Sequence, residues 1–299
     1  MEIEKEYNII IAEYIDFLKE FKSVVEKILI KHKIPIAFGI SGRPKTIDSI
    51  TEKISSERFT IKKTITELND LIGLRIVLLF PEFKSKVVEI LTTEFKLLND
   101  PNKTTNSSDR FGYSSIHLIL AIKDEWTKTL NWEDHSKKKI EVQVRTLSEH
   151  IWAETSHALF YKRKENIPNI INREISKLSA LLEIVDDKLQ NLKDKVDDHF
   201  AYIAQAPYNE ILELDLNSET FRRVMLENSQ GIYNLNDYKN KTLSSSIERN
   251  YNILNINFLH NIISNKIDLK DIDSSRYVEK VIELLEIEKL KIDEQQKKL

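Results

Sequence analysis

Four short apolar runs, separated by segments with helical spacing, constrain the fold more than any other feature of this sequence. The runs are IPIAFGI (34–40), GLRIVLLF (73–80), SSIHLILAI (114–122) and KIEVQVRT (139–146). Glycine, proline, asparagine, aspartate or charged clusters bound each run, which is typical of strands. Apolar residues recur at helical spacing in the segments 3–31, 46–56, 84–95 and 147–162. This order predicts an α/β (α+β) architecture in which helices flank a mixed sheet.

The segment 171–198 predicts one long helix, because apolar side chains form a stripe along it. The stripe consists of Ile175, Leu178, Leu182, Val185, Leu189, Leu192 and Val196. We expect it to pack on its own domain rather than to form a coiled coil. Further helical patterns follow near 217–228, 252–265 and 274–292. The prediction is therefore one domain over 1–205, closed by the long helix, and a C-terminal helical accessory domain of unknown role over 206–299.

The composition excludes several classes of protein and of site. The chain of 299 residues has a net charge of -3, so no chain-wide field attracts nucleic acid or anionic lipid. It contains no cysteine, which excludes disulfides, thiolate metal sites and cysteine nucleophiles and fits a reducing compartment. No apolar stretch approaches the ~18 residues of a membrane helix, and the amino terminus does not resemble a secretion signal. We expect a cytoplasmic protein with no membrane partner.

The run IEVQVRT (140–146) places a polar residue at every second position of a strand that otherwise reads as buried. Because side chains alternate across a strand, its isoleucine and valines face one way. Glu141, Gln143 and Arg145 then face the other way. An edge strand facing water and a buried ion pair with Arg145 are two structural explanations, and a functional site is the third.

Asp70, Arg75 and Glu141 are charged residues next to or inside strands that read as buried. Such a residue needs a partner or a ligand, and Asp70 and Arg75 could satisfy each other or other protein groups. Glu141, however, has the same unusual setting on another strand. Two carboxylates from neighbouring strands are a common Mg²⁺ site for phosphate chemistry, because this cation prefers oxygen ligands. We therefore predict that Asp70 and Glu141 bind Mg²⁺.

Basic and aromatic side chains near these runs predict nucleotide binding. Lys45, Ser49 and Lys53 recur every four residues, so they share one face at the start of a predicted helix. Donors at a strand-to-helix turn hold phosphate, although a solvated basic face explains the same spacing. Tyr113 follows a glycine, where an aromatic ring either stacks on a nucleobase or caps a core. His117 lies on the next strand, either in the site or as a structural histidine.

Five motifs follow one another in the chain: GRPKTIDSITEK (42–53), DLIGLR (70–75), GYSSIH (112–117), EVQVRT (141–146) and WAETSHALFYK (152–162). In this order they resemble the synthetase domain of the RelA/SpoT family of alarmone synthetases, especially its small single-domain members. The resemblance implies a nucleotidyltransferase-like fold. It also implies transfer of the β,γ-diphosphate of ATP to the 3′-hydroxyl of GDP or GTP, which yields ppGpp or pppGpp and AMP.

The resemblance assigns the donor nucleotide to one group of residues. Arg43 and Arg75 would sandwich the adenine of ATP. Lys45, Ser49 and Lys53 would hold its phosphates. These roles suit diphosphoryl transfer, which depends mostly on positioning and on neutralising charge.

The resemblance also assigns the metal and the acceptor. Asp70 would bind Mg²⁺, and Glu141 would approach the metal and help to deprotonate the attacking hydroxyl. The acceptor guanine would stack on Tyr113, with His117 and Gln143 nearby. The family's hydrolase domain carries a histidine-aspartate metal motif that has no counterpart in this sequence. We therefore expect synthesis without hydrolysis.

Two positions depart from the family pattern at the acceptor. Asp109 and Ser114 stand where familiar small synthetases carry basic residues for the acceptor's 5′-phosphates. Arg110 can compensate from the neighbouring position, whereas an aspartate facing a diphosphate repels it. Two alternatives therefore stay open, a toxin that pyrophosphorylates the 3′ end of tRNA and a non-catalytic nucleotide sensor. The C-terminal region remains a candidate for binding an antitoxin or trigger protein, or for supporting a homo-oligomer.

Overall fold

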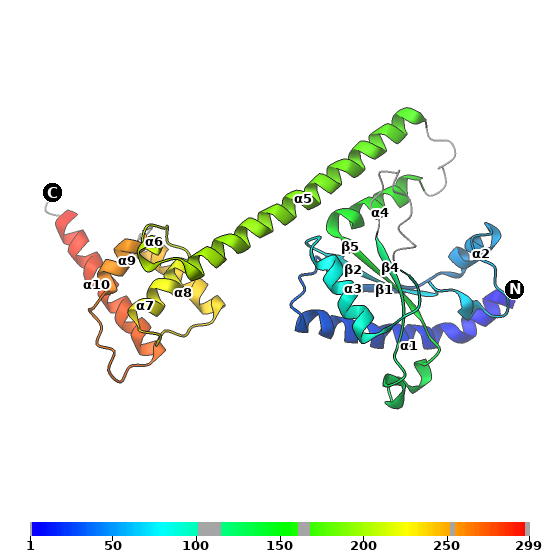
Figure 1. Ribbon diagram of the computed structural model, residues 1–299, viewed down its shortest axis with the longest axis horizontal. Coiled ribbons are helices and arrows are strands. Elements are labelled where there is room, and N and C mark those ends of the chain that lie inside the picture. Colours follow the sequence, from blue (N-terminus) through cyan, green and yellow to red (C-terminus); the bar gives the residue numbers. More distant parts are fainter. Residues whose placement is uncertain (1, 101–114, 161–167, 252–254, 297–299) are drawn as a thin grey trace. The chain divides into compact units, whose positions relative to one another are not determined.

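The computed structural model describes residues 2–100, 115–160, 168–251 and 255–296 (Figure 1). Its contacts divide the chain into two compact units, Met1–Leu192 and Lys193–Leu299, and each is described by itself. The division falls inside helix α5 (Asn169–Gln205), whereas the predicted domain boundary lies at the end of this helix. None of the described helices combines the length and the apolar character needed to cross a membrane.

Within the described residues of the N-terminal unit, five strands form one mixed sheet in the order β1-β2-β5-β4-β3. They are β1 (Ser41–Pro44), β2 (Ile72–Leu78), β3 (Lys96–Leu97), β4 (Ile116–Ala121) and β5 (Ile140–Thr146). Strands β2 and β5 are parallel, and the other neighbouring pairs are antiparallel. The mixed sheet with its flanking helices confirms the predicted fold class.

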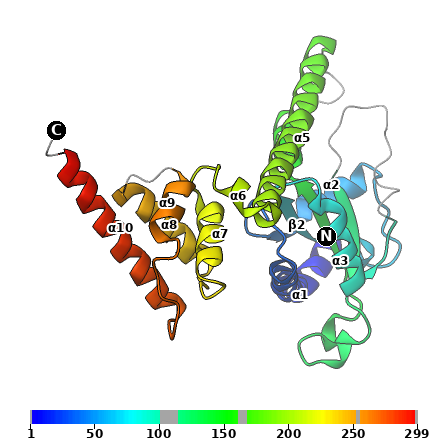
Figure 2. The ribbon, with the colours of Figure 1, turned by 60° about the vertical axis from the view of Figure 1, so that its left-hand side comes forward.

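Apolar side chains cover one face of this sheet. Leu74, Ile76, Val142 and Val144 are buried there and share a core with Phe21 of the first helix. The helices of this unit before α5 are α1 (Glu2–Lys31), α2 (Ile47–Ser55), α3 (Phe83–Glu94) and α4 (Leu147–Phe160), with short 3-10 helices at Ile65–Glu67, Trp126–Lys128 and Glu133–His135. Helix α1 runs along the sheet in Figure 1, and in Figure 2 it is seen nearly end-on beside the sheet. The burial confirms the apolar half of the alternation in β5.

The predicted strand at 34–40 is wrong. This segment makes one isolated bridge, between Ile36 and Leu78, and β1 begins only at Ser41. Pro35 has no backbone N–H to donate, which disfavours a regular ladder at the start of this segment. Lys33 has a φ of 54°, a left-handed conformation that ends α1 just before it. Strand β3 contains too few residues for a sequence pattern to indicate it.

Much of the apolar stripe on α5 stays exposed, contrary to the expectation that it packs on its own domain. Leu178, Val185 and Leu192 are 43%, 40% and 60% exposed. On the buried side of the helix, the Thr146 hydroxyl at the end of β5 donates a 2.5 Å hydrogen bond to Asp186 Oδ2. A polar contact therefore joins α5 to the sheet.

The C-terminal unit is helical, as predicted, and has a core of its own. After the end of α5 it contains α6 (Tyr208–Ile211), α7 (Ser218–Asn228), α8 (Asp237–Tyr251), α9 (Ile256–Ile263) and α10 (Ser274–Gln296). Phe221, Met225 and Leu259 are among the fully buried side chains of this core. The sequence did not indicate α8, because Asn240 and Ser244 occupy buried positions on it that are usually apolar.

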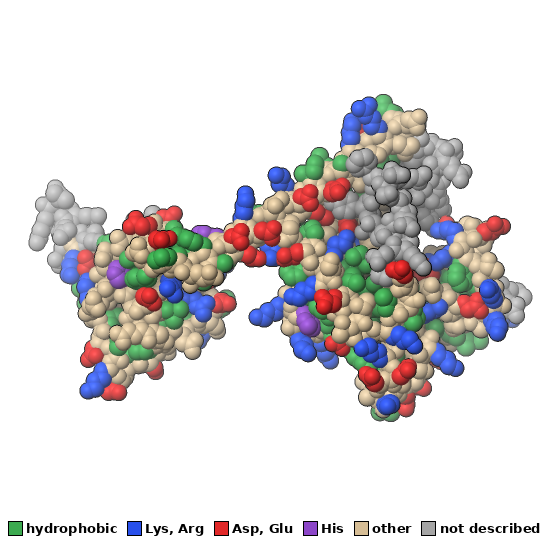
Figure 3. Space-filling view, viewed as in Figure 1, with side chains coloured by type: hydrophobic (Ala, Val, Ile, Leu, Met, Phe, Trp, Pro, Cys, Tyr) green, Lys and Arg blue, Asp and Glu red, His purple; other side chains and the backbone are tan. Residues whose placement is uncertain are grey.

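The surface carries charges of both signs. On the face shown in Figure 3, Lys and Arg side chains are interspersed with Asp and Glu over both units. Mixed charges create no broad field of one sign on that face, so attraction of a polyanion there has to be local.

Tyr277→Phe is expected to leave the free energy of unfolding of the C-terminal unit unchanged, or to raise it by up to about 1 kcal/mol. Tyr277 is fully buried, and its hydroxyl has no hydrogen-bond partner among the described residues. Tyr233→Phe is the matched control, because the buried Tyr233 hydroxyl donates a 2.8 Å hydrogen bond to Asn240 Oδ1. That control is expected to lose about 1–2 kcal/mol. Urea unfolding of the full chain measures both, and equal losses would contradict the expectation.

Candidate active site

Strand β1 leads directly into helix α2 through a short turn. Arg43 lies inside β1, paired with Gly73 of β2, and not on the turn that follows this strand. Thr46 caps α2, since its Oγ1 accepts a hydrogen bond of 3.3 Å from the backbone N–H of Ser49. The cap fixes Lys45 at the strand-to-helix turn, next to the start of the helix.

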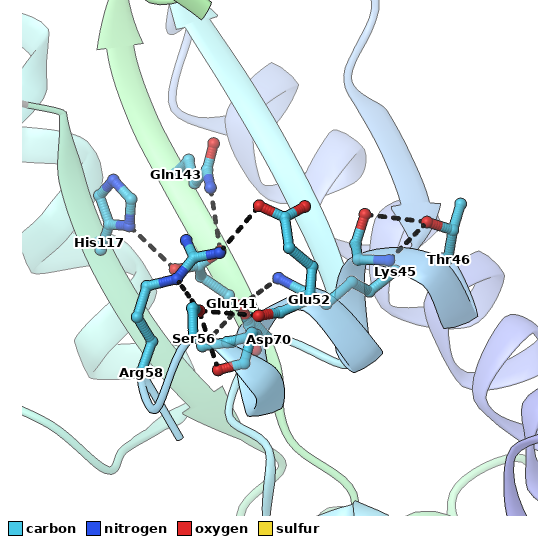
Figure 4. A network of polar contacts seen from close by, with 11 residues as sticks. Lys45, Thr46, Glu52, Ser56, Arg58, Asp70, His117, Glu141 and Gln143 are labelled. Carbon is cyan, nitrogen blue, oxygen red and sulfur yellow. Dashed lines mark hydrogen bonds and ion pairs between the residues drawn. The ribbon is translucent and has the colours of Figure 1, made fainter. Parts of the chain in front are cut away.

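Asp70 binds two lysines of this segment at one oxygen atom (Figure 4). Lys45 Nζ lies 2.7 Å and Lys53 Nζ 2.9 Å from Asp70 Oδ2. Asp70 and Arg75 therefore do not pair with each other but with other protein groups, as the second structural alternative has it: Arg75 Nη1 lies 2.7 Å from Glu154 Oε1 of α4. Burial raises the pKa of Asp70, but the hydrogen bonds from the two lysines outweigh it and hold the pKa below its usual value. Asp70 is ionised at neutral pH.

The polar face of β5 lies at the centre of the sheet, because β2 and β4 flank this strand. The register places Glu141 beside Gly73, and Gln143 between Arg75 and His117. The explanation of the polar face as an edge strand facing water is therefore wrong. Three strands instead bring polar side chains together on the face opposite the apolar core.

A chain of hydrogen bonds runs along this face. Ser115 Oγ lies 2.8 Å from His117 Nε2, and His117 Nδ1 lies 2.9 Å from Glu141 Oε1. Gln143 Nε2 donates to Glu141 Oε2 at 2.9 Å, and Arg145 Nη2 donates to Gln143 Oε1 at 2.5 Å. Burial raises the pKa of Glu141, but its contacts with His117 and Gln143 outweigh burial and lower the pKa below the usual value. Glu141 is therefore an ionised carboxylate held at both oxygens.

A pocket of about 470 Å³ opens on the same face. Eight predicted site residues line it: Arg43, Lys45, Ser49, Asp70, Arg75, His117, Glu141 and Gln143. Lys53 is connected to the pocket through its ion pair with Asp70. Arg110 and Tyr113 lie outside the described residues. The structure thus brings the predicted donor and metal residues to one cavity.

Other residues of the pocket were not assigned a role in it from the sequence: Ser41, Thr46, Leu74 and Glu154. Thr46 precedes an amphipathic helix, which is the signal of a helix cap and could have found it. Glu154 lies on α4, far along the chain from Arg75, so only the tertiary structure shows that they pair. The pocket therefore contains a third acidic side chain besides Asp70 and Glu141.

The two carboxylates fit the predicted Mg²⁺. Asp70 Oδ1 is buried and has no hydrogen-bond partner among the described residues, so this oxygen is available as a ligand. The negative charge of Asp70 acts on Glu141 and tends to raise the pKa of that residue. The described part of the chain contains no group of three or more acidic, histidine or cysteine side chains placed to hold a metal. A pair of carboxylates suits a cation that completes its shell with water and phosphate oxygens.

Three helices hold the C-terminal end of β5. Thr146 N donates to Glu149 Oε2 at 2.8 Å and Glu149 N donates to Thr146 Oγ1 at 3.1 Å, which forms a capping box at the start of α4. Lys84 of α3 forms an ion pair with Glu149, and Asp186 of α5 bonds Thr146. These contacts fix the strand that carries Glu141.

Comparison with known proteins agrees with this geometry. Residues 42–166 match the family model described as "Region found in RelA / SpoT proteins". This segment is a RelA/SpoT domain. It contains Asp70, Glu141 and every described residue that lines the pocket except Ser41. The predicted resemblance is confirmed.

Proteins similar to this chain align with between about half and two thirds of its length. The GTP pyrophosphokinase YjbM of Bacillus subtilis (strain 168) is 27% identical over an alignment of 194 residues, which covers 60% of this chain and 88% of the relative. The GTP pyrophosphokinase YwaC of the same strain is 26% identical over 162 residues, 52% of this chain and 73% of the relative. The crystal structure of small alarmone synthetase 1 from Bacillus subtilis aligns with a TM-score of 0.54 and 25% identity, over 64% of this chain and 98% of that chain. The structure of that synthetase bound to its product pppGpp aligns with the same TM-score and identity.

Proposed function

We propose that this protein is a diphosphotransferase that moves the β,γ-diphosphate of ATP to the 3′-hydroxyl of GDP or GTP. The observation that carries the proposal is one pocket that contains the ionised carboxylates and basic residues of a RelA/SpoT domain. The relatives named GTP pyrophosphokinases, and a structural neighbour with pppGpp as its product, support a guanine nucleotide as the acceptor. We also propose synthesis without hydrolysis, because the matched RelA/SpoT segment corresponds to small synthetases.

Different residues of the pocket have different roles in the proposed reaction. Lys45, Ser49 and Lys53 bind the phosphates of ATP, and the guanidinium groups of Arg43 and Arg75 stack on its adenine. The acceptor oxygen forms a bond to the β-phosphorus, the bond from that phosphorus to the oxygen bridging it to the α-phosphate breaks, and AMP leaves. Positioning and charge neutralisation supply most of the rate in such transfers.

Glu141 accepts the proton of the attacking hydroxyl. Its carboxylate is ionised and held by His117 and Gln143, so it meets the hydroxyl in a fixed orientation. Asp70 and Glu141 are the residues that would hold Mg²⁺, and the bound cation would neutralise charge on the transferred diphosphate. On the acceptor side we assign guanine stacking to Tyr113 and a phosphate contact to Arg110.

One assay tests the proposal. Purified protein is mixed with Mg²⁺, ATP labelled in the γ-phosphate, and GDP, GTP or total tRNA. Label in a guanosine 3′-diphosphate together with release of AMP is expected, and EDTA is expected to abolish both without unfolding the chain. Label on tRNA alone would overturn the guanine nucleotide as acceptor. Release of no AMP with any acceptor would favour a non-catalytic nucleotide sensor.

The tRNA acceptor remains a second candidate because of Asp109 and Ser114. These residues stand where a 5′-diphosphate would need basic side chains. The 3′ end of tRNA presents no free 5′-diphosphate beside the reacting sugar, so it would tolerate both residues. The same assay separates the two acceptors directly.

A further inference from the structure

Arg145 is a buried cation that the proposed reaction does not use. It follows Gln143 on the polar face of β5 and is 7% exposed. Among the described residues, Arg145 makes one hydrogen bond, which its Nη2 donates to Gln143 Oε1. Its Nε and Nη1 have no hydrogen-bond partner there. None of the described carboxylates lies within ion-pair distance of its guanidinium. The explanation of the polar face as an ion pair with Arg145 is therefore wrong.

A buried guanidinium with so few partners does not stabilise the fold. Burying a charge without a close partner costs free energy, and buried N–H groups without acceptors add to that cost. Burial lowers the pKa of Arg145, and the nearby charge of Arg75 lowers it further. The charges of Glu154, Glu141 and Glu149 act in the opposite direction and favour the charged form. A methionine of similar length would fill the same space without these penalties.

The orientation of Gln143 gives the cation a role. An amide side chain can present either its oxygen or its nitrogen to a neighbour, because the two ends have nearly the same shape. Arg145 has only donors, so its bond to Oε1 requires the nitrogen of Gln143 to face the other way. That nitrogen donates to Glu141 Oε2 at 2.9 Å. Without Arg145 the amide oxygen loses this hydrogen-bond donor, so the side chain is free to rotate and its nitrogen can leave the carboxylate.

We propose that Arg145 is a positioning residue of the transfer reaction: it fixes the Gln143 amide, which in turn holds Glu141 toward the acceptor hydroxyl. Arg145 does not line the pocket, whereas Gln143 and Glu141 do, so it acts through them and touches no nucleotide. The other carboxylate oxygen is held independently by His117. This inference rests on the proposed function, because it gives Glu141 its reaction.

Kinetics of a double-mutant cycle test the proposal. Arg145→Met is expected to lower kcat about 10- to 100-fold, since small misplacement of a catalytic group has effects of this size, with KM for ATP within about 3-fold. Gln143→Leu is expected to cause a similar loss, and the double variant should be no slower than Gln143→Leu alone. Multiplication of the two losses in the double variant, or a loss confined to KM, would overturn the proposal. Arg173→Met, at an exposed position on α5, is the matched control and should leave kcat unchanged.

A second measurement does not depend on activity. The side-chain amides of glutamine are labelled with ¹⁵N and observed by NMR. The signal of the Gln143 amide is identified as the one that disappears in Gln143→Leu. In the wild-type chain we expect this signal to exchange slowly with water and to lie away from those of exposed glutamines. Arg145→Lys keeps the positive charge but lacks the guanidinium, and it should move the signal toward those of exposed glutamines, as should Arg145→Met. An unchanged signal would overturn the role of Arg145, whereas absence of transfer by the wild-type chain would overturn the proposed function instead.

Discussion

Glu141→Gln is expected to lower the rate of diphosphate transfer about 10³-fold and to leave the fold intact. The substitution removes the base for the acceptor hydroxyl and one of the two carboxylates proposed to hold Mg²⁺; a general base alone contributes 10²–10⁴-fold. The amide keeps the size of the carboxylate and can still accept the contact from His117. Its amide nitrogen faces Gln143 Nε2, so two donors meet and the hydrogen bond between these two side chains is lost. We expect a stability loss of about 1–2 kcal/mol. Release of AMP measures the rate, and thermal unfolding measures the stability.

Glu89→Gln is the matched control for this variant. Glu89 is exposed on α3 and does not line the pocket, so the rate and the stability of Glu89→Gln should equal those of the wild-type chain. Near wild-type turnover by Glu141→Gln would contradict the role of this strand face in catalysis. A general loss of folded protein in Glu141→Gln would instead show that the hydrogen-bond chain is mainly structural.

The features that could be predicted from the sequence are those carried by local patterns. Glu141 was found because a strand has a period of two, so its side chain must leave the apolar face whatever the strand pairs with. Asp70 was found because an acid beside an apolar strand is unusual. The order of the motifs predicts that both residues belong to one site, and this prediction does not depend on the strand register.

The features that could not be predicted depend on pairing between distant segments. Nothing local indicates that Lys45 and Lys53 share one oxygen of Asp70, or that Glu154 of α4 engages Arg75. The apolar run at 34–40 is the stronger local signal for a strand. Only the pairing with β2 shows that β1 begins after this run. The exposure of the stripe on α5 likewise depends on which side of that helix faces the sheet.

Asp70→Asn is expected to change binding and catalysis in opposite directions. The rate of transfer should fall about 10²- to 10³-fold, because a charge arranged for the reacting phosphates is lost. Binding of ATP in the presence of EDTA should become several-fold tighter. The carboxylate that repels the phosphates is then neutral, and Lys45 and Lys53 no longer share an anionic partner.

The lysine variant provides the comparison that separates these effects. Lys45→Met removes a cation from the pocket, so it should weaken metal-free binding of ATP by about 10-fold, the opposite sign to Asp70→Asn. Asp124→Asn, at an exposed position, controls for loss of a negative charge elsewhere and should change neither quantity. Isothermal titration with EDTA measures binding, and release of AMP with Mg²⁺ measures the rate. Weaker metal-free binding by Asp70→Asn would mean that Asp70 mainly orders the two lysines for the phosphates, because loss of that order would then outweigh the relief of repulsion.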